Sequence, residues 1–351
     1  MKINVITLKT TANFNAEQKA PSDIVNFLKD KFDARATFIK GTNNTRNIFI
    51  KLLKRFKFTY EFIKARLKGE IVILQFPMFE TTTLLNKLFL FNMNFLNKKK
   101  TIILIHDLDG IRNQNEQAYK QDLDRINKVN YVIVHNEIMK KKLEDDGVKA
   151  KIYVLELFDY LCDYSNKNLE NKNINFNNPE VIYAGNLAKE KSPFIHQLDK
   201  KKMKFTLNLY GVGIGKNINN KIIYIDKYHS NELPNKIKGN LGLIWDGNLD
   251  DSDKDIGMKN YTKYNNPHKL SCYMAAGIPV IAWEEAAISN FIKKHKVGYV
   301  IKNIYDINNI NYNNYEEILE NAKKIQVNVR NGYYTTRVIK EILNDIVRVN
   351  K

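Results

Sequence analysis

The chain has 351 residues, enough for two domains of average size, and its hydrophobic share of 44 % excludes a disordered protein. Its two cysteines, Cys162 and Cys272, match no metal-ligand spacing and are too few for a disulfide framework, which favours a reducing compartment. The net charge of +18 fits an anionic partner, which can be nucleic acid, anionic lipid or a phosphorylated substrate. It equally fits a genome rich in A/T, since Lys, Asn and Ile are all abundant and A/T-rich codons specify all three.

The N-terminal half alternates predicted strands and helices. Lys2–Leu8 reads as a strand and not as a signal peptide, because no small-residue cleavage site follows its short apolar run. A polar loop, Lys9–Pro21, leads into a helix over Ser22–Lys31, and Arg46–Leu67 has a second helical pattern. The other predicted strands of this half are short β-branched runs, namely Ala34–Ile39, Glu70–Phe76, Thr101–His106, Tyr131–His135 and Lys151–Leu155.

An Asn-rich segment, Asp163–Pro179, has few apolar residues and is typical of an interdomain linker. After it the alternation restarts. The predicted strands are Glu180–Ala184, Lys204–Tyr210, Lys221–Ile225, Asn240–Trp245, Pro279–Trp283 and Gly298–Ile301. The predicted helices are Asn231–Lys238, Pro267–Ala276, Ala286–Lys294, Tyr315–Ile325 and Tyr333–Val349.

This order predicts an α/β fold with two Rossmann-like, doubly wound domains that face each other across a cleft, where such sheets bind ligands. The predicted domains are residues 1–162 and 180–325, joined by the linker 163–179 and followed by a C-terminal helix in 326–351. No apolar stretch approaches the roughly 20 residues of a membrane-spanning helix. We therefore expect a cytoplasmic protein, free or at the inner face of the cell membrane.

The strongest local motif is NNPHKLSCYMAAGIPVIAW, residues 265–283. A loop ending in Asn266 and Pro267 opens a helix, since proline suits a first helical turn. His268, Lys269 and Ser271 then lie where free N–H groups and the helix dipole favour an anion such as a diphosphate. The same pattern also fits an ordinary amphipathic helix with a surface lysine.

The motif resembles the donor-site helix of GT-B glycosyltransferases. Lys269-Leu270-Ser271, Tyr273 and the AAGIPVI run are most similar to a bacterial subfamily that includes the adhesin-glycosylating glucosyltransferase and polysaccharide β-1,6-galactofuranosyltransferases. The resemblance implies that a UDP-sugar is bound here, by Asn266, His268, Lys269, Leu270, Ser271 and Tyr273.

One position departs from the wider GT-B pattern. Many GT-B enzymes hold the ribose hydroxyls with a glutamate where this chain has Cys272, and the resembling subfamily also replaces that glutamate. The ribose contacts therefore stay unassigned. Asn-Pro-His before Lys269, together with Trp283, favours the galactofuranosyltransferase branch over the glucosyltransferase branch.

Two glycine-containing loops follow predicted strands of the same domain. Glycine lets a backbone turn sharply, and its amides can cradle a phosphate. Two lysines of the first loop are within reach of a phosphate, although they equally fit a solvated cluster, and the second loop can be only a turn. The residues concerned are Gly185, Asn186, Lys189, Lys191, Gly211 and Gly213.

A His-Asp pair, His106 and Asp107, follows the buried run TIILI. At the carboxyl end of a strand, Asp107 is placed to take the proton from an acceptor hydroxyl, while His106 orients the acceptor or shares that role. The resemblance supports this interpretation, because a His-Asp…Arg run follows the corresponding strand in the subfamily, with Arg112 as the arginine here. In the alternative, Asp107 only caps the next helix.

Other polar segments point to the same cleft. The resemblance implies a nucleotide contact from the first loop, by Ser22 or Thr11, although Ser22 also fits a helix N-cap. Asp246 follows the strand GLIW. The acidic run Asp250–Asp255 contains two D-x-D spacings, but metal sites of that kind belong to one-sheet GT-A enzymes. We read the run as a solvated loop and expect no metal and no other cofactor.

The stretch Lys40–Lys68 has nine Lys or Arg and one Glu, interleaved with apolar residues. A basic amphipathic helix can lie on anionic lipid. The pattern equally fits a helix packed on its own sheet, or one that touches an acceptor or a second subunit. The resemblance suggests a homo-oligomer.

These observations predict a hexosyltransferase that moves a sugar from a UDP-sugar to a saccharide, glycolipid or glycoprotein acceptor in cell-surface polysaccharide or glycoconjugate assembly. UDP-galactofuranose is favoured over UDP-glucose as the donor. The positive net charge leaves one alternative, a non-catalytic nucleic-acid-binding or partner protein. The sequence shows no recognised nucleic-acid-binding module, which argues against nucleic-acid binding.

Overall fold

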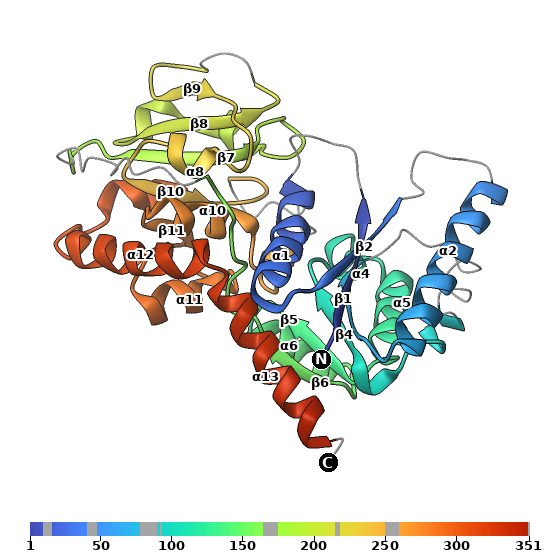
Figure 1. Cartoon of the computed structure of the whole chain (residues 1–351). Helices are drawn as coiled ribbons and strands as arrows, with labels where there is room; N and C mark the ends of the chain where they lie inside the picture. The colour runs from blue at the N-terminus through green and yellow to red at the C-terminus, as the bar shows by residue number, and fades with distance from the viewer. Residues whose placement is uncertain are drawn as a thin grey trace. The chain divides into compact units, whose positions relative to one another are not determined.

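The computed structural model describes residues 1–9, 16–40, 48–77, 90–91, 93–163, 175–214, 218–249 and 260–349 (Figure 1). The chain divides into two compact units. Unit 1 comprises residues 1–13, 17–156 and 334–351, and unit 2 comprises residues 14–16 and 157–333. Each unit holds one six-stranded sheet.

The sheet of unit 1 has the strand order β2-β1-β3-β4-β5-β6, and its strand pairs are parallel. The order reverses between β1 and β3, so a doubly wound sheet has its switch point there. The strands β3, β4 and β5 are buried at every residue, as expected for β-branched runs covered on both faces. The six strands are β1 (Ile3–Lys9), β2 (Arg35–Lys40), β3 (Ile71–Phe76), β4 (Thr101–Ile105), β5 (Tyr131–Val134) and β6 (Lys151–Val154).

Two helices of this part of the chain, α5 and α6, begin at side-chain caps. Asn115 and Asn136 accept hydrogen bonds from the backbone N–H groups of Ala118 and Met139, which fixes the starts of α5 and α6. The helices are α1 (Ala16–Phe32), α2 (Ile48–Leu67), α4 (Asp109–Arg112), α5 (Glu116–Ile126) and α6 (Glu137–Asp145).

Helix α1 begins earlier than the sequence predicts. Residues 16–21 are helical, so the predicted polar loop up to Pro21 is wrong for this part, and Ser22 lies inside the helix and not at its N-cap. Lys19 and Asp23, one turn apart, form a buried ion pair with an Nζ–Oδ2 distance of 2.5 Å. A charge pair between neighbouring turns supports a helix without leaving any trace in its apolar periodicity.

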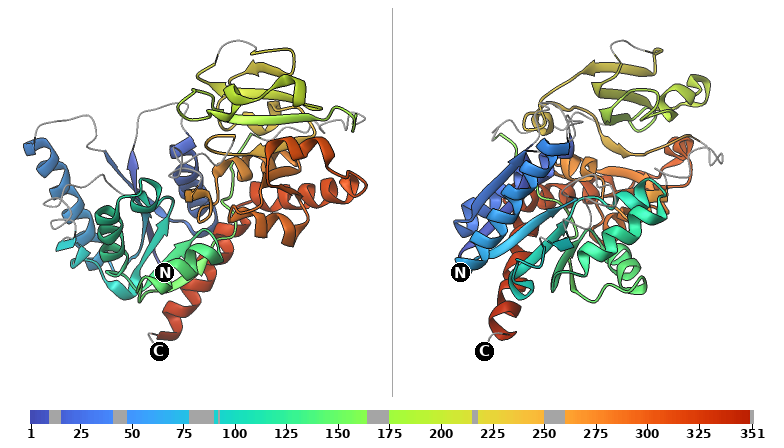
Figure 2. Two further views of the ribbon diagram at one scale, coloured as in Figure 1. Left: turned by 180° about the vertical axis from the view of Figure 1, so that it is seen from behind. Right: turned by 90° about the vertical axis from the view of Figure 1, so that its right-hand side faces the viewer.

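The last helix, α13 (Tyr333–Val349), packs on unit 1 beside β6 (Figure 2). Arg337 donates from Nη2 to the carbonyls of Val154 and Leu155, at 3.0 and 3.1 Å. Near the other end of the helix, the Asp345 carboxylate accepts hydrogen bonds from Lys151 and Tyr153. The C-terminal residues therefore complete the unit to which the N-terminal strands belong.

The sheet of unit 2 has the order β12-β11-β10-β7-β8-β9, again with parallel pairs. Its switch point lies between β7 and β10. The prediction of two doubly wound Rossmann-like domains is confirmed. The strands are β7 (Glu180–Asn186), β8 (Thr206–Val212), β9 (Ile222–Asp226), β10 (Leu241–Ile244), β11 (Val280–Trp283) and β12 (Gly298–Ile301). The helices are α7 (Phe194–Gln197), α8 (Leu233–Lys236), α10 (His268–Ala276), α11 (Ile288–His295) and α12 (Tyr315–Arg330).

Among the helices of the described ranges, none combines the length and the apolar character that crossing a bilayer requires.

Candidate functional site

A charged pair lies at the switch point of unit 2. Lys269 is in the first turn of α10, and Asp246 follows the end of β10. The Lys269 ammonium donates to Asp246 Oδ1 at 2.7 Å and lies 5.1 Å from the centre of the Tyr183 ring on β7. The sequence predicts that Asp246 and Lys269 lie at the same edge of the sheet, and in the structure their side chains are in contact.

The electrostatics of this pair keep the lysine charged. Burial works against the charge of Lys269, but the Asp246 carboxylate and the Tyr183 hydroxyl outweigh it, so the pKa of Lys269 is raised. Burial also raises the pKa of Tyr183 and keeps its hydroxyl neutral. Ser192 donates to the carbonyl of Asn186 at 2.6 Å, so the Tyr183 hydroxyl is the donor in its 2.7 Å bond to Ser192.

The glycines beside the pair allow close approach of backbones. A Cβ added to Gly185 would lie 3.2 Å from Lys269 Cε, so the lysine stem runs directly over this glycine. Gly211 has φ +144°, and a Cβ there would lie 1.8 Å from the Gly185 carbonyl oxygen. Gly213 has φ +104°, and a Cβ there would lie 2.5 Å from the backbone nitrogen of Ala188. Gly211 is thus required by the β7–β8 pairing, and Gly213 by the close approach of the two loops that follow these strands, whatever a ligand adds.

Three residues predicted to contact a donor lie inside unit 2. Leu270, Ser271 and Tyr273 are all buried, with exposed fractions of 0, 1 and 0 %. The Tyr273 hydroxyl accepts from the N–H of Ala184 at 2.9 Å and lies within 3.3 Å of carbonyls on both β7 and β10. Its ring fills the space that a side chain at Gly242 would need. The Tyr273 side chain thus supports β7 and β10, and contacts of these three residues with a donor stay a prediction.

The start of α10 is held by aromatic rings. The His268 ring stacks on Tyr160 at 5.0 Å between centres, with Phe158 at 6.2 Å, and Asn266 is buried. Tyr160 is itself anchored, since its hydroxyl donates to the Ser230 carbonyl at 2.8 Å. Sequence reasoning missed Tyr160, because an aromatic residue far from the motif has no local signal that connects it with His268.

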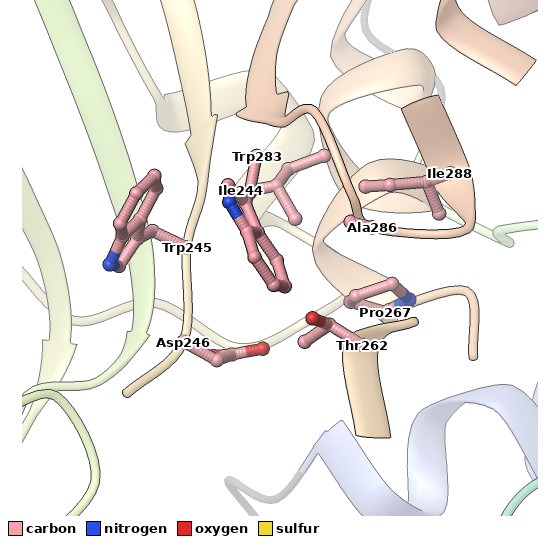
Figure 3. Close-up of a pocket in the computed structure, with 8 residues that line it drawn as sticks. All are labelled: Ile244, Trp245, Asp246, Thr262, Pro267, Trp283, Ala286 and Ile288. Carbon is pink, nitrogen blue, oxygen red and sulfur yellow. The ribbon is translucent and has the colours of Figure 1, made fainter. Parts of the chain in front are cut away.

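A small pocket opens beside Asp246 (Figure 3). Trp283 and Asp246 point toward the same space, with Thr262 and Pro267 across from them. Trp283 is held from outside by the Lys263 ammonium, 5.3 Å from its ring centre. The walls of the pocket are mostly apolar. The residues that line the pocket are Ile244, Trp245, Asp246, Thr262, Pro267, Trp283, Ala286 and Ile288.

The other predicted donor residues are more peripheral. Asn186, Lys189 and Lys191 are exposed at the end of β7, with the Asn186 side chain accepting from the N–H of Ala188 at 3.0 Å. Ser22 is exposed on α1. Thr11 and the acidic run 250–255 lie outside the described residues. In the ranges that the structure does describe, no cluster of three or more His, Cys, Asp or Glu side chains could hold a metal.

In unit 1, His106 and Asp107 follow β4, next to the switch point of that sheet. Asp107 Oδ2 accepts from Arg112 Nη1 at 3.2 Å, and about a third of each side chain is exposed. Helix α4 has Leu108 at its N-cap, so Asp107 is not the N-cap residue of that helix. His106 Nε2 lies 2.7 Å from Gln75 Oε1 on β3, a partner that sequence reasoning missed.

A second histidine at this sheet edge is structural. His135 follows β5, is buried, and donates from Nε2 to the Ile105 carbonyl at 3.1 Å. Burial lowers the pKa of His135 to about 4, so the ring is neutral at physiological pH. It supports the end of β4, from which His106 and Asp107 follow.

The sequence is similar to known glycosyltransferases over both units. Residues 2–157 match the glucosyltransferase 3-like N-terminal domain, and residues 181–342 match the glucosyltransferase 3-like C-terminal domain. Beta-1,6-galactofuranosyltransferase WbbI of Escherichia coli K12 is 31 % identical over 79 % of this chain and 80 % of its own length. Glucosyltransferase 3 of Streptococcus parasanguinis is 27 % identical over 78 % of both chains.

Solved structures share the fold at much lower identity. Anabaena Alr3699/HepE, crystallised with UDP and glucose, has a TM-score of 0.55 and 10 % identity, over 99 % of this chain and 100 % of its own. Sucrose-phosphate synthase of Thermosynechococcus elongatus has a TM-score of 0.58 and 11 % identity, over 99 % of this chain and 98 % of its own. These likenesses agree with the predicted GT-B architecture.

Proposed function

Since the chain belongs to the glucosyltransferase 3-like family, it is a glycosyltransferase, and we propose that it takes its sugar from a UDP-linked donor bound at the Lys269–Asp246 pair. The observation that carries this proposal is a charged lysine in the first turn of α10, held at the switch point of its sheet. Doubly wound sheets bind nucleotides at such points. The presence of UDP in the structure of the similarly folded Anabaena protein supports it.

The diphosphate of the donor is the group that this site suits best. Lys269 offers a full positive charge, and the first N–H groups of α10 add hydrogen-bond donors and the positive end of the helix dipole. A phosphate that pairs with Lys269 competes with Asp246 for the ammonium, which releases that carboxylate toward a hydroxyl of the donor. Lys189 and Lys191, exposed at the end of β7, supply further charge.

In the proposed reaction, an acceptor hydroxyl attacks the anomeric carbon of the donor sugar. Asp107 takes the proton from that hydroxyl as the new C–O bond forms. The bond from the anomeric carbon to the diphosphate breaks, and UDP leaves with its negative charge stabilised by Lys269 and the α10 N-terminus. Because these groups supply the charge stabilisation, we propose that no metal is needed.

The donor sugar is proposed to be galactofuranose, with glucose as the second candidate. The relative named as a galactofuranosyltransferase is 31 % identical, and the relative named as glucosyltransferase 3 is 27 % identical. We propose a saccharide, glycolipid or glycoprotein acceptor and a cytoplasmic enzyme at the inner face of the membrane.

Thermal unfolding with a panel of nucleotides tests the donor site. A ligand that binds only the folded protein raises its melting temperature. We expect UDP to do so, GDP, CDP and dTDP to do so less, and EDTA to change nothing. Transfer assays with UDP-galactofuranose and UDP-glucose then identify the sugar. If no nucleotide shifts the melting temperature, the proposed binding of a UDP-linked donor is contradicted. Loss of the UDP shift in EDTA contradicts the metal-free proposal.

Helix α2 has a face suited to an anionic lipid surface. Phe62 and Ala65 are buried against unit 1, whereas Phe56, Tyr60 and Leu67 are 69, 61 and 83 % exposed. The exposed residues recur at intervals of about one or two turns, and Ile63, 37 % exposed, completes their stripe. With lysines and arginines along the same helix, this is the pattern of an interfacial helix.

Vesicle sedimentation tests this surface. We expect the protein to sediment with phosphatidylglycerol vesicles and not with phosphatidylcholine vesicles, and the triple variant F56S/Y60S/L67S to stay in the supernatant. The matched control is V327S, since Val327 is an apolar residue on α12 of unit 2 that is 58 % exposed. Equal sedimentation of the triple variant and the control contradicts lipid binding through this stripe. A change of oligomeric state in the triple variant would instead identify the stripe as an interface with a second copy.

A further inference from the structure

Gln75 joins three elements of unit 1 through one buried side chain. It lies near the end of β3 and is 3 % exposed. Its Nε2 atom lies 3.0 Å from the carbonyl oxygen of Pro21 on α1, and its Oε1 atom lies 2.7 Å from Nε2 of His106, which follows β4. The proposed reaction assigns no role to this glutamine.

The carbonyl of Pro21 sets the direction of both hydrogen bonds. A carbonyl oxygen can only accept, so the Gln75 atom that faces Pro21 must be the amide nitrogen. The amide oxygen then faces His106, and an amide oxygen also only accepts. His106 Nε2 must therefore carry a hydrogen, and in the neutral imidazole the lone pair is on Nδ1.

We propose that Gln75 is a positioning residue that holds neutral His106 as its Nε2–H tautomer, so that Nδ1 is the nitrogen that accepts a hydrogen bond or proton. The backbone of His106 is fixed as well, since its N–H donates to the Phe76 carbonyl at 2.7 Å. The tautomer of His106 is thus determined by Gln75 on β3 together with the Pro21 carbonyl on α1. For catalysis this inference rests on the proposed function, in which His106 and Asp107 handle the proton of the acceptor hydroxyl.

The choice of an amide has a chemical consequence. A glutamate at position 75 would also accept from Nε2–H, but its negative charge would favour the imidazolium, which has no lone pair to accept with. A glutamine orients the ring without adding charge. The charged groups on the neighbouring segments include Asp107, Asp109 and Arg112 after β4 and the Lys19–Asp23 pair on α1, and replacing Gln75 alters none of these residues.

Nitrogen-15 NMR of the histidine rings tests the tautomer directly. The chain has six histidines, and the signals of His106 are those that disappear in H106Q. We expect the Nε2–H pattern for His106 in the wild type, and a mixture of both tautomers in Q75M. The matched control Q114M, at an exposed glutamine after α4, keeps the wild-type pattern. An Nδ1–H pattern in the wild type, or an unchanged His106 pattern in Q75M, overturns the proposal.

A second variant keeps the test decisive if Q75M does not fold. We expect Q75E to show both ring nitrogens of His106 protonated at a pH where the wild-type ring is neutral, and an unchanged neutral ring in Q75E overturns the proposal. In transfer assays both variants should lose about tenfold or more in kcat with the same melting shift by UDP. If the wild type transfers no sugar, the proposed function is contradicted. The NMR experiment tests the tautomer of His106 independently of transfer activity.

Discussion

The two sheet edges of this protein have similar topology and opposite chemistry. At the β7–β10 switch point of unit 2, a lysine is held by a carboxylate and lies over a glycine. Beside the β1–β3 switch point of unit 1, an imidazole is held by an amide, and the neighbouring carboxylate is held by a guanidinium. The first edge is suited to binding an anion and the second to moving a proton.

The comparison shows how little of such a site the fold itself provides. Both sheets place strand ends, backbone amides and a few side chains at one edge. The side chains and their immediate partners then decide what each edge does: Asp246 and Tyr183 keep Lys269 charged, and Gln75 and Arg112 orient His106 and Asp107. Variants that alter one edge alone should therefore separate donor binding from chemistry.

The largest effect is expected for Asp107→Asn. The amide keeps the shape of the carboxylate but cannot take up the acceptor proton, so kcat should fall by about 10²–10⁴-fold. The melting shift caused by UDP should stay the same, because the proposed donor site is at the other sheet. D109N on α4 is the control. Activity of D107N within a few-fold of the wild type would show that Asp107 is not the base.

The converse is expected for Lys269→Met. Loss of the ammonium should remove the UDP melting shift and lower kcat/KM by about 10²–10³-fold, because the leaving diphosphate loses its charge partner. The double variant K269M/D246N removes the carboxylate that K269M leaves without its lysine, and it should recover stability but not activity. K263M, a lysine over Trp283 in the same unit, is the control. An unchanged melting shift by UDP in K269M would show that UDP does not bind at this sheet edge.

The pH dependence of stability tests the buried, neutral state of His135 in unit 1. The folded-state pKa of His135 is about 4, below the ordinary 6.5, so only the unfolded chain takes up its proton as the pH falls from 6.5 to 4. This lowers the free energy of unfolding by about 2 kcal/mol at pH 5 relative to pH 7.5. His135→Gln should lose less stability than the wild type over that interval, as measured by urea unfolding at both pH values.

Asp122 acts in the opposite direction and has to be separated from His135. Burial raises the pKa of Asp122 to about 6, so its ionised form is disfavoured in the folded state, and stability rises as the pH falls from 6 toward 3.8. This contribution is present in the wild type and in H135Q alike. The difference between their two pH profiles therefore isolates His135, and parallel profiles would contradict its neutral, buried state.

The smallest effect is expected for Gly185→Ala. The new Cβ would lie 3.2 Å from Lys269 Cε, so the flexible lysine stem must shift by a few tenths of an ångström. We expect UDP affinity to fall by up to about tenfold, roughly 1.4 kcal/mol, with little change in melting temperature. Gly211→Ala is the contrast, because its Cβ would overlap the Gly185 carbonyl and prevent folding. Unaltered UDP affinity in G185A would show that the position of the Lys269 stem is unimportant.

Much of the fold could be predicted because strands of a parallel sheet are local apolar runs. All twelve strands of the two sheets coincide with predicted runs to within a few residues, and α13 has its predicted bounds. The failure at α1 has a physical reason. Its first turns contain a charge pair and Pro21 instead of an apolar stripe, so periodicity predicted a loop.

By itself the sequence determined the fold class, the family and the chemical type of the residues at each sheet edge, since these depend on local patterns and on motifs such as AAGIPVI. Only the tertiary structure decided which of those residues meet. Lys269 pairs with a residue 23 positions away and His106 with one 31 positions away, and no sequence period links such positions. Tyr273 shows the same limit: it belongs to the motif, yet packing against Gly242 turned its side chain into the core.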